Sequence, residues 1–403
     1  MRPTQAARAY PFREPTALVL EPEYAHLRQR EPLSRISLPY GGDAWLAVRH
    51  ADVRTVLGDP RFSRAALLDR DVPRASPRRH TDATLHTVDP PEHTRLRRLV
   101  AAAFSPRRIE RLAEHAQHVT DELLDRIEEQ GPPADLITGF AVPVPVAVIC
   151  QMLGVPVADR DRFAGWIDVA LATTAFSSEE IHDAFASLKD YVAGLVAARR
   201  REPGDDLLGA LVEARDTEDR LSENELVVLG VTLLYAGLET TTSELGNGIH
   251  TLLTHPDQLA ALRADPSLID RAVDELLRFN PLVTSAGFTR IALEDVELGG
   301  VLVRAGDAVM VHPDAANRDE RVFERPDELD VTRKPNPHLA FGFGLHYCVA
   351  AQLAKAELRV AIGSLLRRFP DLRLAVGVEE LSWRRGRMAR GLDRLPVTWS
   401  SAS

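Results

Sequence analysis

The sequence predicts one large, mainly α-helical domain with small β-sheets, which we expect to extend over residues 1–403. Long segments place apolar residues at helical spacing, whereas strand-like stretches are short and lie at both ends of the helical region. Hydrophobic residues make up 45% of the chain and charged residues 27%, a composition that excludes a disordered, collagen-like or coiled-coil protein. No repeat or low-complexity linker marks a domain boundary.

The individual elements follow from residue spacing and from start and turn signals. Ser222 followed by Glu225 forms a capping box, and Pro106 suits the first turn of a helix. The polar stretch 64–91 contains several prolines and predicts a functional loop with room for a short helix inside it. We predict helices over 48–58, 92–103, 106–129, 160–170, 178–201, 222–253, 256–262, 266–279 and 348–368, and strands over 34–39, 44–49, 288–292, 301–303, 307–312 and 396–399.

Charge and cysteine content exclude several classes of protein. A net charge of −10 argues against a general nucleic-acid binder. Two cysteines, Cys150 and Cys348, are too few for a disulfide framework, a four-cysteine zinc site or an iron–sulfur cluster. No signal peptide is visible, so we expect a cytoplasmic protein. The uncharged stretch 136–157 is long enough to span a bilayer, but three prolines interrupt it. This favours the start of a buried helix in a soluble protein over a membrane span.

The densest chemistry lies in the segment 341–348, with the sequence FGFGLHYC, which precedes an apolar helical stretch. Glycines let the backbone approach a flat ligand closely. A cysteine that opens a helix lies at the positive end of the helix dipole, which favours the thiolate and lowers the thiol pKa. A lone cysteine would more often be structural, but the glycines and His346 favour a thiolate that is presented to one metal centre.

This segment resembles the haem-binding loop of the cytochrome P450 family, F-G-x-G-x-H-x-C-x-G. The resemblance extends from about residue 15 to the C-terminus, and Ala350 departs from it where the family usually has glycine. It implies that Cys348 is the axial ligand of the iron of haem b. It also implies that the haem lies between the long distal helix, about 222–253, and the cysteine-loop helix, about 348–368.

A second motif, AGLETT at 236–241, lies within the long predicted helix. Thr240 can donate a hydrogen bond to the carbonyl of Ala236 and loosen the helix, and Gly237 leaves room beside it. Alone, this pattern could equally be a helix-packing notch. It resembles the oxygen-binding motif of the P450 family, which implies that Glu239 and Thr240 are catalytic residues for proton delivery.

A third pattern is the E-x-x-R pair Glu275 and Arg278, which share one helix face. The pattern is weak by itself, because Glu92 and Arg95 also fit it. The resemblance implies a structural network in which Arg333 joins this pair, and we expect the network to determine folding, since buried charges persist only when they are paired.

Haem carries two propionate carboxylates, which arginine and histidine can bind through charge-assisted hydrogen bonds. His93 and Arg97 share a helix face but alone would more often be solvated surface residues. The surrounding segment resembles helix C of the P450 family. The resemblance implies that His93, Arg97, Arg290 and His346 contact the propionates, with His338 as a weaker candidate.

The implied function is that of a bacterial-type haem-thiolate monooxygenase. It inserts one oxygen atom from O2 into a C–H bond or an alkene. No reductase domain is visible, so we expect electrons to come from a separate ferredoxin and an NAD(P)H-dependent ferredoxin reductase, and we expect a monomer. Candidate residues for a basic ferredoxin-docking rim are Arg98, Arg107, Arg333, Lys355 and Arg359.

The substrate is expected to be a bulky hydrophobic small molecule. Arginine-rich, lysine-poor composition suggests a high-GC organism, so we expect a polyketide, macrolide or peptide intermediate of secondary metabolism. Apolar side chains on the distal side would contact it, although the same side chains could be ordinary core. The candidates are Leu85, Leu233, Ala236, Gly237, Val283, Ala286 and Met388.

Three alternatives remain open. A haem-thiolate enzyme could catalyse isomerisation, dehydration or oxidative coupling without oxygen insertion, although the intact Glu239 and Thr240 argue against it. A P450-like helper protein without haem is disfavoured by Cys348 and the propionate residues. A zinc hydrolase that uses His115 and His118 lacks an H-E-x-x-H motif.

Overall fold

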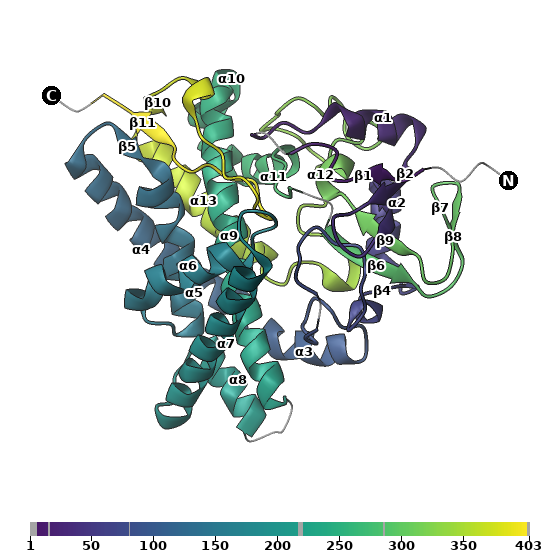
Figure 1. Cartoon of the computed structure of the whole chain (residues 1–403). Coiled ribbons are helices and arrows are strands. Elements are labelled where there is room, and N and C mark those ends of the chain that lie inside the picture. The colour runs from purple at the N-terminus through teal and green to yellow at the C-terminus, as the bar shows by residue number, and fades with distance from the viewer. Residues whose placement is uncertain (1–5, 15–16, 80, 217–220, 285–286, 401–403) are drawn as a thin grey trace.

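The computed structural model describes residues 6–14, 17–79, 81–216, 221–284 and 287–400. Helices form most of the molecule, and a smaller β-rich part lies beside them (Figure 1). The described α-helices are α1 Pro22–Arg30, α2 His50–Gly58, α3 Glu92–Ala101, α4 Pro106–Gln130, α5 Pro143–Leu153, α6 Arg160–Ala170, α7 Ser178–Arg201, α8 Leu207–Asp216, α9 Glu223–Thr254, α10 Pro256–Ala264, α11 Ile269–Phe279, α12 Pro313–Ala316 and α13 Ala351–Arg368.

The main sheet joins strands from two distant parts of the sequence. Its strand order is β1-β2-β3-β9-β6-β4, and the parallel pair β3–β9 aligns Trp45 with Val309. A three-stranded sheet has the order β10-β11-β5, and β7 and β8 form a hairpin at Gly299 and Gly300. The strands are β1 Arg8–Ala9, β2 Leu33–Ser37, β3 Asp43–Ala47, β4 Phe62–Ser63, β5 Ala134–Asp135, β6 Gly287–Ala292, β7 Val296–Leu298, β8 Val301–Val303, β9 Ala308–Val311, β10 Arg373–Leu374 and β11 Pro396–Thr398.

Helix α9 is the central helix of the molecule. Ser222 accepts a hydrogen bond from the amide of Glu225, and the Glu225 side chain accepts one from the Ser222 amide, so the predicted capping box is confirmed. The helix is long and apolar enough to cross a membrane, but 67% of its most apolar window is buried inside the fold. A helix that is apolar on most of its faces is expected at the centre of a large helical domain.

The structure confirms the predicted fold class and the long helices and strands. The uncharged stretch 136–157 contains α5, whose apolar side chains are buried in the core, as expected. Sequence periodicity missed short or polar elements: helices α1, α8 and α12, and strands β1, β4, β5, β7 and β10. Among the described residues of the predicted loop, 64–79 and 81–91, the one helical turn is the 3-10 turn Ala65–Leu67.

Candidate haem and oxygen-activation site

The cysteine loop is fixed against helix α2 by its glycines. Gly342 and Gly344 have φ angles of +73° and +72°, a conformation that glycine adopts without steric cost. A Cβ atom at Gly344 would lie 2.7 Å from the carbonyl oxygen of Leu57, so the close approach to α2 requires glycine. The guanidinium of Arg54 lies 4.3 Å from the ring centroid of Phe343 and covers the loop from the same side.

Cys348 is held at the closed end of this loop, where its amide donates to the carbonyl of Phe341 at 2.9 Å. Helix α13 begins at Ala351, so the prediction that the helix starts at Cys348 was wrong. Burial raises the thiol pKa, while the backbone N–H of Ala350 and the charge of Arg97 lower it. Burial outweighs these two effects, so the Cys348 pKa is raised where the sequence predicted a lowered one. Coordination to a metal cation would deprotonate such a thiol.

Ala350, which stands where the family pattern usually has glycine, is compatible with the local backbone. Ala350 has φ −94° and ψ 9°, which any L-residue adopts, and its carbonyl accepts the first helical hydrogen bond from the amide of Ala354 at 2.9 Å. The backbone at this position therefore does not require glycine.

The four predicted propionate residues come together from three separate segments. His93 and Arg97 lie on α3, Arg290 on β6, and His346 on the cysteine loop. The His93 and His346 ring centroids are 4.4 Å apart, and Arg97 Nη1 donates to the carbonyl oxygen of Tyr347 at 2.6 Å. Helix α3 is thereby joined directly to the loop that carries Cys348.

This cluster contains more positive groups and hydrogen-bond donors than its protein neighbours satisfy. Burial and the charges of Arg290 and His93 lower the His346 pKa to about 2, and burial lowers the Arg290 pKa to about 10. His93 Nε2 and Arg290 Nε are buried without a hydrogen-bond partner among the described residues. Two carboxylates supplied by a ligand would satisfy these donors, so the residues present fit the two propionates of haem.

Sequence reasoning missed Arg64 and His86, which belong to the same cluster. Arg64 is buried and donates to the carbonyl oxygens of His86 at 2.7 Å and Thr289 at 2.5 Å. Burial, together with neighbouring positive charges, lowers the Arg64 pKa to about 9 and the His86 pKa to about 4. Both residues lie in the polar loop 64–91, where no periodicity or motif distinguishes them from surface residues.

A family model described as Cytochrome P450 matches residues 43–374. The chain belongs to the cytochrome P450 family. It is 52% identical to a nocardicin C N-oxygenase of Nocardia uniformis subsp. tsuyamanensis and 46% identical to a mycinamicin IV hydroxylase/epoxidase of Micromonospora griseorubida, in each case over 97% of this chain and 98% of the relative. A solved structure, "cytochrome P450mel 107F1 with biaryl coupling reactivity", matches with a TM-score of 0.94 and 46% identity over 98% of this chain and all of its own.

Membership of this family makes the protein a haem b oxidoreductase of the monooxygenase type. The relatives act in secondary metabolism and are bacterial. Bacterial P450s take electrons from a ferredoxin and a reductase and act on small molecules.

The oxygen-motif residues of this P450 lie in the middle of α9. Thr240 Oγ1 donates to the carbonyl oxygen of Ala236 at 2.9 Å, as predicted, within a helix that stays continuous. A Cβ at Gly237 would lie 3.1 Å from Ile149 Cδ1, so this glycine lets α5 pack closely against α9. The motif therefore serves both purposes: Gly237 allows close helix packing, and Thr240 forms the local hydroxyl hydrogen bond.

Glu239 has the properties of an acid that works near neutral pH. Its side chain is buried, and burial raises its pKa to about 7, although the charge of Arg384 opposes this rise. Glu239 Oε1 lies 3.9 Å from Arg384 Nη2 and has no hydrogen-bond partner in the described part of the chain. A carboxyl with a pKa near the working pH can both hold and release a proton.

The E-x-x-R network forms as the resemblance implied. Arg278 donates twice to the Glu275 carboxylate at 2.8 Å, and Arg333 Nε adds bonds of 3.1 and 3.0 Å to the same carboxylate. Glu275 and Arg278 are almost fully buried, and Arg278 also donates to the carbonyls of Asn317, Pro326 and Glu328. His338, the weaker propionate candidate, instead lies 3.4 Å from Asp274.

The network excludes Arg333 from the predicted ferredoxin-docking rim, because its side chain is 8% exposed and paired. Lys355 is paired with Asp274 and Arg359 with Asp270. Arg98 and Arg107 are exposed.

The predicted substrate contacts divide into core and surface residues. Leu85 and Leu233 are buried in the core cluster that contains α5, α7 and α9, and Ala236 and Gly237 are partly buried on α9. Val283 pairs with Ala389 through a β-bridge, next to Met388, which is 50% exposed. Ala286 lies outside the described residues.

Within the described ranges, no group of three or more histidine, cysteine, aspartate or glutamate residues is arranged to hold a metal ion. His118 pairs with Glu122 on the exposed face of α4, at 3.1 Å. This geometry gives the zinc-hydrolase alternative no support.

Proposed function

We propose that this P450 inserts one oxygen atom from O2 into a secondary-metabolite intermediate, at a C–H bond, an alkene or a heteroatom. The observation that carries this proposal is that Thr240 is adjacent on α9 to the buried acid Glu239, whose pKa is raised to about 7, and that Glu239 Oε1 has no hydrogen-bond partner among the described residues. The relatives support the range of reactions, since one is named an N-oxygenase and another a hydroxylase/epoxidase.

Different residues of this chain would bind haem, activate oxygen by delivering protons, and contact the electron donor. Cys348 would ligate the iron, and His93, Arg97, Arg290 and His346, with Arg64 beside them, would hold the propionates. Bound haem would supply the activation of dioxygen. Thr240 would place its hydroxyl at the oxygen site, and Glu239 would deliver protons to it from the interior. Electrons would arrive from a separate ferredoxin and an NAD(P)H-dependent reductase, with Arg98 and Arg107 as candidate docking residues.

Oxidative coupling without oxygen insertion is a second candidate function. It is favoured by the 46% identical structural relative that is described as having biaryl coupling reactivity. Coupling would use the same thiolate and propionate residues but would leave no oxygen atom in the product.

Turnover under ¹⁸O2 separates the two functions. The purified enzyme would be reconstituted with a ferredoxin and reductase and supplied with a panel of macrolides, polyketides and cyclic peptides. We expect products that carry one ¹⁸O atom. Dimeric or cyclised products without label would support coupling instead and overturn oxygen insertion.

A further inference from the structure

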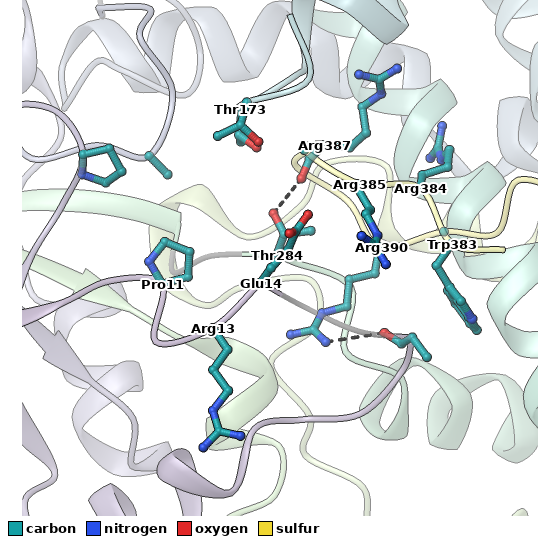
Figure 2. A pocket seen from close by; sticks show the side chains of 16 residues that line it. Pro11, Arg13, Glu14, Thr173, Thr284, Trp383, Arg384, Arg385, Arg387 and Arg390 are labelled. Carbon is teal, nitrogen blue, oxygen red and sulfur yellow. Dashed lines mark hydrogen bonds between the residues drawn. The ribbon is translucent and has the colours of Figure 1, made fainter. Parts of the chain in front are cut away.

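A cavity of about 290 Å³ lies next to the acid of the oxygen motif. Most of its lining comes from the N-terminal segment near Arg13, the loop after α6 with Thr173, the segment at Thr284 and the C-terminal segment 383–391, and Pro39 and Ala75 complete it (Figure 2). Arg384 lines the cavity and also lies 3.9 Å from Glu239. A molecule bound here would therefore contact a residue that faces the oxygen-motif acid.

The C-terminal wall of this cavity is unusually rich in arginine, with the sequence RRGRMAR at 384–390. Asp168 and Glu239 neutralise these arginines only in part, and Glu14 lines the same cavity but forms no ion pair with them in the described part of the chain. Asp168 is a single carboxylate that bonds to Arg387 at 2.9 and 2.7 Å and lies 3.8 Å from Arg384. Arg385 is exposed and forms no ion pair among the residues that the structure describes.

Two of these guanidinium groups retain unused donors. Arg384 Nε and Arg387 Nη1 are buried without a hydrogen-bond partner in the described structure. Leaving a buried charged donor unsatisfied is costly, so such donors mark a place where a ligand supplies the acceptor. Both belong to side chains that line the cavity, and Figure 2 shows that they come from the same segment.

The backbone that carries the arginines is held in place from two sides. The carbonyl of Gly386 accepts hydrogen bonds from the amides of Thr173, Thr174 and Ala175, at 2.8, 3.3 and 3.3 Å. On the other side, Thr284 Oγ1 donates to the carbonyl of Arg387 at 2.6 Å. This arrangement preorganises the guanidinium groups before a ligand binds.

We propose that Arg384, Arg385 and Arg387 bind a carboxylate of the substrate, while the apolar lining of the cavity holds the substrate body. The planar fork of donors on arginine matches a carboxylate, and Pro11, Pro39 and Trp383 supply apolar contact. The substrate class is thus an apolar molecule with an acid group remote from the oxidised atom. This inference rests on the proposed monooxygenase function, because it treats the cavity as part of the substrate site.

The test uses the haem-loaded enzyme and three pairs of probes that differ in charge but little in shape: benzoate and benzamide, 4-phenylbutyrate and 4-phenylbutyramide, and 1-naphthaleneacetate and 1-naphthaleneacetamide. Kd is measured from the ligand-induced shift of the haem spectrum and from thermal stabilisation. We expect at least one acid to bind about tenfold tighter than its amide, the value of one charge-assisted hydrogen bond.

Arg385→Gln and Arg387→Gln should each reduce or remove this preference for the acid. Arg394→Gln, an exposed arginine on the same C-terminal segment but outside the cavity lining, should retain it. Equal affinity for acid and amide in all three pairs, or an acid preference that survives both cavity substitutions, overturns the proposal. The carbon-monoxide spectrum of the same samples reports separately on haem-thiolate ligation, so failure of the proposed function would be recognised independently.

Discussion

The positive side chains beside the cysteine loop and those that line the cavity form two clusters that differ in their surroundings. The cluster beside the cysteine loop is buried, and the pKa values of Arg64, Arg290 and His346 are lowered because burial disfavours their charged forms. Among the arginines of the cavity, Arg385 is exposed and Arg384 and Arg387 are partly exposed, and Asp168 already neutralises part of their charge. The first arrangement suits an anion that stays bound, such as the haem propionates. The second suits an anion that exchanges, such as a substrate carboxylate.

The largest effect that separates the two clusters is expected on haem retention. Arg97→Ala and Arg290→Ala should each remove a charge-assisted hydrogen bond of about 1.5–3 kcal/mol and accelerate haem release about 10–100-fold. Transfer of haem to apomyoglobin measures this rate. Arg385→Gln is the matched control and should release haem as the wild type does. If the cavity variant loses haem as readily as the other two, the distinction between the clusters does not hold.

A smaller and more specific effect is expected at Thr240. Thr240→Ala removes the hydroxyl that we propose lies at the oxygen site but leaves both positive clusters intact. Substrate-induced spectral shifts should therefore persist, while product per NAD(P)H consumed falls and hydrogen peroxide rises. Retention of wild-type coupling in this variant would show that the hydroxyl does not control proton delivery.

The smallest effect is a change in the pH profile. The Glu239 pKa is raised to about 7, so the carboxyl carries its proton below that pH and loses it above. Turnover should fall as the pH rises through about 7, because the proton donor becomes ionised. Glu239→Gln should turn over more slowly than the wild type and should lack this transition. An unchanged profile in Glu239→Gln would assign the titration to another group.

The sequence predicted the long helices because their apolar spacing continues over many residues, as in α7 and α9. It did not predict the two-residue strands β1 and β4, which are too short to show a period, and it also missed α8, although the ten residues of that helix are long enough to show one. The pairing of β3 with β9 also escaped prediction, since the aligned Trp45 and Val309 are far apart in the chain.

The candidate site was predictable where a motif gives several residues at fixed spacing, as in the cysteine loop and at Glu239 and Thr240. Arg64 and Arg384 were missed because each acts through neighbours brought together only by folding. The direction of the Cys348 pKa was wrong for a related reason: burial depends on tertiary packing and outweighs the local backbone contribution.

The proposed function depends most on Cys348 as the thiolate ligand of haem iron, and the reduced carbon-monoxide spectrum tests this role directly. Cys150 provides a matched control, because it is also a free cysteine and burial raises its pKa to about 11. We predict that Cys348→Ser loses the red-shifted band of thiolate-ligated haem, whereas Cys150→Ser keeps it. A band that persists in Cys348→Ser, or that disappears only in Cys150→Ser, would contradict the assignment of the site.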